Sequence, residues 1–161
     1  MTMRALTILP LLLLCLAGCA GNRAAGVTAY GNLLTVPVPA QESGIAADAA
    51  ARLVASYPPA HTRFTLQHAA QDGFGAELLG QLRARGYAIG EFTAPEASNS
   101  PLPSSPSVGA TPLRYVLDLA REPDLVRLTL YTGGESLTRA YLIQGDAARP
   151  ASAWIHREAG P

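Results

Sequence analysis

Lysine is absent from this 161-residue chain, and all twelve of its basic residues are arginines. Twelve acidic residues balance the arginines, so the formal net charge is zero. A protein without an excess of positive charge lacks the general attraction to phosphate backbones on which nucleic-acid binding depends. The composition therefore gives no reason to expect direct contact with DNA or RNA.

Cysteine is scarce, because the chain contains only Cys15 and Cys19. Both lie close to the N-terminus, and no cysteine follows them. A disulfide within the folded part and a zinc site made of cysteines are therefore excluded for the sequence after Cys19.

The chain has a single long apolar run, at residues 5–17. The run follows Arg4, the only charged side chain before Arg23, and small residues come directly after it. A positive start, an apolar stretch and small residues together are typical of a secretory signal peptide. A transmembrane helix is not expected here, because the run is shorter than the roughly 20 residues that cross a bilayer and is interrupted by Pro10.

The run ends in Leu16, Ala17, Gly18 and Cys19, and this tetrapeptide resembles a bacterial lipobox. In such signals the cysteine thiol receives a diacylglyceryl group, and the peptidase then cuts before the cysteine. We therefore expect residues 1–18 to be a lipoprotein signal peptide and Cys19 to be the lipidated N-terminus. The alternative is an ordinary signal peptide in which the cysteine is incidental.

The residue after the cysteine bears on the destination of the lipoprotein. Lipoproteins that stay at the inner membrane usually carry aspartate there, whereas this chain has Ala20. We therefore expect an outer-membrane lipoprotein that faces the periplasm. Two or three acyl chains on Cys19 would hold it stably, because each buried methylene contributes about 0.8 kcal/mol.

The rest of the chain divides into a spacer and one domain. Residues 19–44 are rich in glycine, alanine and proline without helical periodicity, which predicts a flexible tether. Tyr30, Leu33, Leu34 and Val36 are too apolar for a pure spacer and could pack on the domain or on a partner. Residues 45–161 have the length of a single domain with a modest core.

Hydrophobic periodicity predicts the elements of this domain. Two helices are expected, at 45–57 with Ser43 as the cap, and at 72–85 with Asp72 as the cap and Gly86 as the closing residue. Alternating apolar residues predict strands. The expected strands are 62–68, 87–92, 113–120, 125–132, 137–144 and 151–158.

This order of elements predicts an α+β fold. Two helices alternate with two strands, and an antiparallel meander follows, so we expect a small two-layer sandwich with the helices on one face of a mainly antiparallel sheet. Residues 93–112 contain five prolines and five serines, a composition that predicts a disordered loop within the domain.

The sequence contains no motif that we can assign to catalysis or to a cofactor. "DGFGAELLG" follows a strand and opens a helix, as a dinucleotide fingerprint does, and Gly73 and Gly75 occupy its first two glycine positions. Leu78 stands at the third position, and Gly80 comes two residues too late. We therefore interpret the segment as a glycine-rich helix start, with Gly80 allowing close packing.

Scattered polar residues leave an enzyme as one of the alternatives. His61, His68 and His156 have no spacing typical of metal ligands, and we expect His68 to be a half-exposed sheet residue. The acidic residues Asp118, Glu122 and Asp124 are better explained by a solvated turn than by paired acid–base catalysis. A deep pocket lined by His68, Asp118 or Ser136 would favour an enzyme instead. Our expectation is a protein without catalytic residues, cofactor or metal.

Aromatic residues gather in the C-terminal meander, namely Tyr115, Tyr131, Tyr141 and Trp154. Cross-strand aromatic pairs stabilise sheets by roughly 0.2–1 kcal/mol each, and we favour this explanation. The alternative is a docking face or a sheet edge that a partner strand extends.

Three stretches of the chain resemble the TrbH family of conjugal transfer lipoproteins: "VTAYGN" at 27–32, "IAADAAARLVASYPPAHTRFTLQ" at 45–67 and "DGFGAELLGQLRARGYAIGEF" at 72–92. "YPPAHTRFTL" is the most specific piece, and "AWIHRE" near the C-terminus fits less closely. The likeness covers most of the chain after the signal, apart from the proline- and serine-rich loop.

The resemblance implies a structural component of the mating-pair formation apparatus, a type IV secretion machine. Its partners would be the membrane, through the lipid on Cys19, and other subunits of the channel. Nucleic acid and small-molecule substrates are not expected as direct partners. A generic envelope lipoprotein with a binding or assembly role unrelated to conjugation is the alternative.

Overall fold

A computed structural model describes residues 30–36, 38–92, 109–122 and 124–158 of the chain. The expected signal peptide, the lipobox at 16–19 and the lipidation of Cys19 lie outside these residues, as does most of the loop predicted at 93–112. Within the described part, no helix has the length and apolar character needed to cross a membrane.

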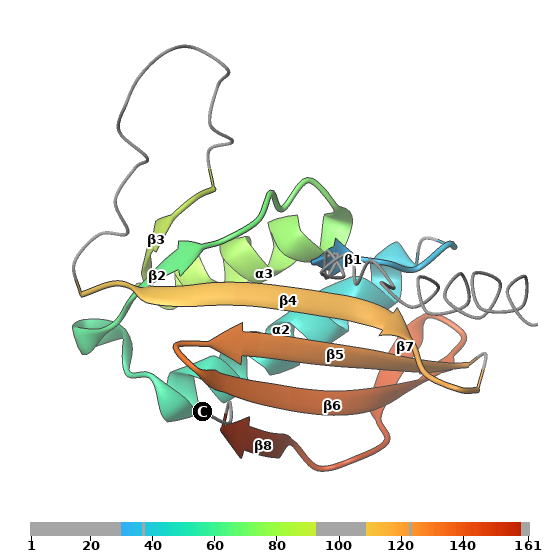
Figure 1. Cartoon of the computed structure of the whole chain (residues 1–161). Coiled ribbons are helices and arrows are strands. Elements are labelled where there is room, and N and C mark those ends of the chain that lie inside the picture. Colours follow the sequence, from blue (N-terminus) through green and yellow to red (C-terminus); the bar gives the residue numbers. More distant parts are fainter. Residues whose placement is uncertain (1–29, 37, 93–108, 123, 159–161) are drawn as a thin grey trace, which may run out of the picture.

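The protein has an α+β fold in two layers, as the sequence predicts. One eight-stranded sheet forms the first layer, and two helices pack against one of its faces as the second (Figure 1). The strands are β1 (Gly31–Asn32), β2 (Arg63–Leu66), β3 (Ala88–Gly90), β4 (Thr111–Leu119), β5 (Leu125–Thr132), β6 (Glu135–Gln144), β7 (Ala147–Pro150) and β8 (Ile155–Glu158).

The sheet has a parallel part and an antiparallel part. Its order is β3-β2-β4-β5-β6-β7, with β1 also paired to β4 and β8 also paired to β6. The strands β1, β2 and β3 run parallel to their neighbours, whereas β4, β5 and β6 form an antiparallel meander. The helix α3 (Gly73–Ala84) connects the parallel strands β2 and β3, as parallel pairing requires.

The helix α2 (Pro39–Ser56) begins six residues earlier than the sequence predicts. Pro39 stands at the start of the helix, where its missing N–H costs nothing and its fixed φ angle suits the helix. Ser43 is therefore inside the helix and is not its cap. Gly31 and Asn32, expected as tether, form β1, and residues 39–44 form the first turns of α2, so the tether prediction is wrong for these residues.

The helix α3 confirms the predicted end signals. The Asp72 carboxylate caps its start, with Oδ1 accepting a hydrogen bond of 2.8 Å from the Gly75 N–H. Gly86 closes it with a φ of +89°, a conformation that glycine adopts without steric cost.

The hydrophobic core lies between the sheet and the helices. Ile45, Ala49 and Leu53 of α2 are fully buried, and Leu78 and Leu82 of α3 meet them from the neighbouring helix. Alternate residues of the meander supply the other half of the core, because successive side chains of a strand point to opposite faces. These residues are Leu113, Tyr115, Leu117, Val126, Leu128, Leu130, Leu137 and Tyr141.

Several strand predictions need correction. The strand β2 ends at Leu66, so His68 lies in the connection to α3 and not in the sheet. Pro112 belongs to β4, although it was expected to lie in the loop. A short 3-10 helix, η2 (Pro59–His61), precedes β2, and the short strands β1 and β7 were not predicted.

Candidate functional site

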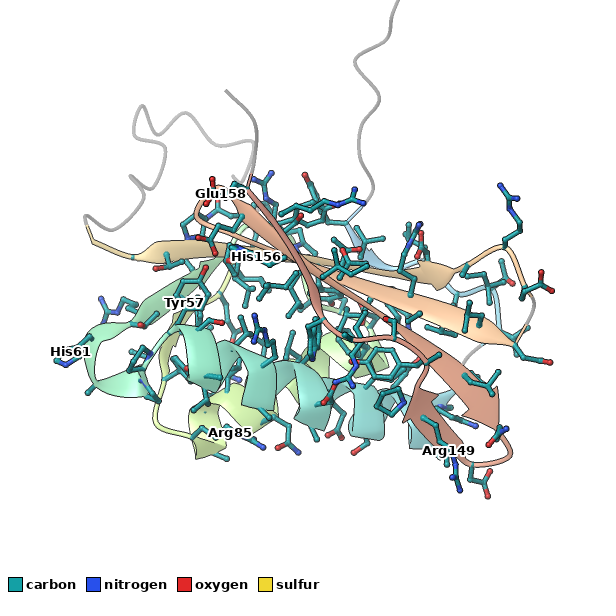
Figure 2. The ribbon with its side chains drawn as sticks, turned by 90° about the horizontal axis from the view of Figure 1, so that it is seen from below. Tyr57, His61, Arg85, Arg149, His156 and Glu158 are labelled. Atoms are coloured by element: carbon teal, nitrogen blue, oxygen red, sulfur yellow. The ribbon has the colours of Figure 1, made fainter. Side chains whose placement is uncertain are left out.

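The face of the sheet opposite the helices carries polar and charged side chains. In the meander these side chains alternate with the core residues, and no helix of the described residues covers them. Figure 2 shows the two layers edge-on, with the sheet above the helices. We call the uncovered side the helix-free face.

The strand register arranges this face in rows that cross the strands. One row consists of Arg114, Tyr131, Ser136 and Arg157, from β4, β5, β6 and β8 in turn. The next row consists of Val116, Thr129, Thr138 and Ile155. A third row places Asp118 beside Arg127 and Ala140.

The rows surround a shallow, open hollow of about 530 Å³. Its floor includes the second row, where the Thr138 hydroxyl donates to the Thr129 hydroxyl at 3.2 Å. Apolar groups reach it from two sides, because Leu33 follows β1 and Ile155 lies on β8, with exposed fractions of 44% and 47%. The hollow therefore combines hydroxyl groups with accessible apolar surface.

Arginine dominates the charge of the helix-free face. On strands β2, β4, β5 and β8 it carries Arg63, Arg114, Arg127 and Arg157, together with one carboxylate, Asp118. Asp118 is engaged by Arg127 in a two-point interaction, Nε to Oδ1 at 3.0 Å and Nη2 to Oδ2 at 2.5 Å. This ion pair raises the pKa of Arg127. The three remaining guanidinium groups have no ion pair with a carboxylate among the described residues.

Tyr30 connects the start of the described chain to this face. Its hydroxyl accepts a hydrogen bond of 3.0 Å from Arg114 Nη1, whose guanidinium carbon also lies 4.9 Å from the centre of the Tyr30 ring. The ring meets Tyr131 edge-on at 5.8 Å between centroids. The segment expected as tether therefore supplies an aromatic side chain to the rim of the face.

The four aromatic residues singled out in the meander do not form one group. Tyr115 and Tyr141 are buried on the helix side, 0% and 1% exposed, and each donates its hydroxyl to a helix-side carboxylate at 2.7 Å, Asp72 and Asp48 respectively. Burial is the main reason why the pKa of both tyrosines is raised. These two tyrosines therefore stabilise the fold through bonds to the helix side, whereas none of the aromatic pairs among the described residues joins two of the four as expected. Only Tyr131 belongs to the helix-free face.

Trp154 has a local structural role. The guanidinium of Arg139 lies 5.7 Å from its ring centre and pairs with Asp48 of α2 through Nη1, at 3.0 and 3.1 Å from the two carboxylate oxygens. Arg139 Nε also donates to the carbonyl oxygen of Ser152 at 2.9 Å. These contacts fix the connection that leads to β8.

The three residues considered above for an enzyme site, His68, Asp118 and Ser136, do not line one pocket. Asp118 and Ser136 both line the hollow on the helix-free face, whereas His68 does not. The His68 ring lies between Tyr30 and Tyr115, with centroid distances of 5.8 and 4.5 Å. Burial lowers the pKa of His68 despite the nearby Asp72, and Arg114 acts in the same direction as burial. Of the remaining acidic residues, Glu122 and Asp124 lie in an exposed turn.

A polar cluster near His68 fastens β1 to both helices. Asp72 Oδ2 accepts from the Asn32 N–H at 3.2 Å and from the Tyr115 hydroxyl, while Asn32 Nδ2 donates to Glu42 Oε1 at 2.8 Å. Glu42 is only 4% exposed. Because buried polar groups are costly unless they are hydrogen-bonded, the cluster ties the N-terminal segment to a definite position on the domain.

The glycines of the rejected dinucleotide motif have packing roles that differ from the prediction. A Cβ at Gly75 would overlap the Tyr115 hydroxyl and would lie 2.8 Å from the Ala70 Cβ. A Cβ at Gly73 would lie 2.7 Å from Glu42 Oε2. Gly80, predicted to allow close packing, has open space around it, so that prediction is wrong.

Sequence reasoning missed the rows on the helix-free face. Arg114 and Asp118 do stand at alternate, polar positions of a strand whose apolar residues were recognised, and that alternation could have identified the face. The match of Arg114 with Arg157 depends on three successive strand pairings, which no local pattern encodes. Within the described ranges, no group of three or more histidine, cysteine and acidic side chains could hold a metal ion.

Comparison with known proteins gives one match. Residues 27–158 match the family described as conjugal transfer protein TrbH, and this range contains every described strand and helix. Neither the curated proteins nor the solved structures contain a significant match to the chain. The matched range covers well over half of the sequence, and the chain therefore belongs to the TrbH family of conjugal transfer proteins.

Proposed function

We propose that this protein is an outer-membrane lipoprotein that acts as a structural, non-catalytic subunit of the mating-pair formation apparatus. Cys19 carries the lipid, and the α+β domain contacts neighbouring subunits of the secretion channel. Membership of a conjugal transfer family supports a role in conjugation, and the lipobox at 16–19 supports a lipid anchor on Cys19.

The observation that carries the proposal is the docking of residues 30–34 on the domain. Leu33 N–H donates to the Leu117 carbonyl at 2.8 Å, and Asn32 is held by Asp72 and Glu42. Only eleven peptide steps then separate Cys19 from Tyr30. Since an extended chain spans at most about 3.6 Å per residue, the domain would stay within about 40 Å of the membrane surface.

This short reach suits a subunit with a fixed place in an assembly. A tether that extended to Ile45 would span up to about 90 Å by the same rule and would let the domain sample a wide volume. Holding the domain close to the membrane raises its local concentration near other membrane-anchored subunits, which favours assembly without new contacts.

The test is a Cys19→Ser substitution in donor cells. We expect the variant to leave the outer-membrane fraction, to remain folded, and to lower the conjugation frequency strongly. A matched Cys15→Ser variant, altered within the segment that the peptidase would remove, should behave as the wild type. Normal conjugation by a donor whose Cys19→Ser protein is soluble in the periplasm would refute the anchor as a functional element.

A further inference from the structure

We propose that the helix-free face binds an extended, acidic segment of a partner protein. That the partner is a subunit of the transfer apparatus rests on the proposed function, whereas the binding itself rests only on the structure. Three properties of the face support the proposal: its charge, the spacing of two of its arginines, and the hollow beside them.

The charge of the face is unbalanced although the chain as a whole is neutral. On β2, β4, β5 and β8, four arginines and one aspartate give the helix-free face a formal charge of +3, and Asp118 is already paired with Arg127. Arg63 and Arg157 are exposed and make no ion pair within the described residues. Charges that are separated by more than about 8–10 Å are screened at physiological salt, so acidic residues elsewhere on the domain compensate this excess poorly. Carboxylates of a bound partner would compensate this positive charge directly.

The spacing of two arginines indicates the geometry of the partner. Arg114 and Arg157 stand at opposite ends of one row, with Tyr131 and Ser136 between them. Neighbouring strands lie about 4.8 Å apart, so three pairings separate the two backbones by about 14 Å. An extended peptide advances about 3.4 Å per residue, and carboxylates four residues apart would therefore meet both guanidinium groups.

The hollow beside this row can receive the rest of such a segment. Ile155 and Val116 offer apolar contacts at its two sides, and the hydroxyl groups of Thr129, Thr138 and Ser136 can bond to peptide N–H and C=O groups. A bilayer surface does not enter a hollow of this kind, and a single-stranded nucleic acid would need more stacking platforms than Tyr131 and Tyr30 provide. The planar fork of arginine matches a carboxylate in two-point contacts.

The experiment is a selection of random twelve-residue peptides displayed on phage against the full-length lipidated protein in nanodiscs. Enriched peptides are synthesised with a fluorescent label, and their binding is measured by anisotropy. The same nanodiscs carry the wild type, Arg114→Gln/Arg157→Gln, or the control Arg83→Gln/Arg85→Gln, which removes the same charge at the C-terminal end of α3. Figure 2 shows Arg85 on the helix side of the molecule.

We expect the enriched peptides to carry two acidic residues about four positions apart. Their affinity should fall at least about tenfold for the Arg114→Gln/Arg157→Gln protein and should stay within about twofold for the control. Replacing Arg114 also removes its hydrogen bond to the Tyr30 hydroxyl. The single variant Arg157→Gln avoids this effect, because Arg157 makes no side-chain hydrogen bond among the described residues. It should weaken binding in the same direction.

Three results would overturn the proposal. The first is a selection without acidic enrichment, and the second is equal binding to all variants. The third is binding of phosphatidylglycerol vesicles or of oligothymidylate through Arg114 and Arg157 when no acidic peptide is selected. Because the assay involves no conjugation, its failure is distinct from a failure of the Cys19→Ser test.

Discussion

The two faces of the central sheet come from the same strands and differ in almost every other respect. On β4, for example, Leu113, Tyr115 and Leu117 point to the helices and are completely buried, whereas Arg114 and Asp118 point to the open side. One face is closed by α2 and α3, and the other is hollowed and carries unpaired positive charge. Residues on the covered face therefore stabilise the fold, and residues on the open face are available for binding.

Polar groups also have different uses on the two sides. On the helix-covered side two buried tyrosine hydroxyls have carboxylate partners, Tyr115 with Asp72 and Tyr141 with Asp48, so that each helix is bonded to the sheet. On the helix-free side only Arg127 has a carboxylate partner among the described residues. Polar groups on the covered side therefore serve stability, and those on the open side remain available.

The largest expected effect comes from truncating a core residue of β5. Leu128→Ala should lower the free energy of unfolding by about 2–5 kcal/mol, because it removes apolar contacts and leaves a cavity. Its sequence neighbour provides the matched control on the other face, where Thr129→Ala removes one hydrogen bond and should lower stability by no more than about 1 kcal/mol. Urea denaturation followed by circular dichroism measures both, and equal losses would contradict the distinction between the faces.

A pair of glycine substitutions in α3 should act in opposite directions. Gly75→Ala should destabilise the protein by about 1–3 kcal/mol, because the new methyl group would overlap the Tyr115 hydroxyl and Ala70. Gly80→Ala meets open space in the middle of the same helix and should stabilise by about 0.5–1 kcal/mol, because alanine is the better helix former. Thermal melting of the two variants checks the sign of each change, and a stabilising Gly75→Ala would contradict the packing described here.

The smallest effect concerns pH and involves His68. Burial lowers its pKa in the folded protein, with Asp72 opposing the shift and Arg114 adding to it. Below the ordinary histidine pKa of about 6.5 the unfolded chain therefore binds more protons, and stability falls as the pH decreases through that value. His68→Gln should reduce this dependence between about pH 7.5 and 5.5, as measured by melting temperature. An unchanged slope would show that His68 does not contribute to it.

The sequence alone predicts the helices and the meander well, because their signals are long and local. The alternation in 125–132 matches β5 at both ends, and Asp72 caps α3 as expected. The start of α2 was misplaced because Ser43 and Gly44 suggest a helix boundary, whereas Pro39 begins the helix six residues earlier. The strand β1 has two residues, too few for a periodic pattern, and β7, "AARP", has no alternation of large apolar residues. Both are defined by their pairing with β4 and β6.

The candidate site was less predictable than the fold. Its polar residues occupy the alternate positions of predicted strands, but the rows depend on the register of β4, β5, β6 and β8, which is set by turns and by long-range packing. The role of residues 30–34 was likewise hidden, because Tyr30 and Asn32 are held by partners as distant in sequence as Arg114 and Asp72. Their apolar composition was the one signal that suggested packing.

The most direct test of the account is the conjugation frequency of donors with charge reversals on one face. Donors that carry Arg63→Glu/Arg157→Glu should conjugate at least about tenfold less often than donors that carry Arg83→Glu/Arg85→Glu, because only the first pair replaces attraction with repulsion at the helix-free face. Both proteins should be present in the outer-membrane fraction in equal amounts. Equal conjugation by the two donors would contradict the central claim that this face is the surface through which the protein works.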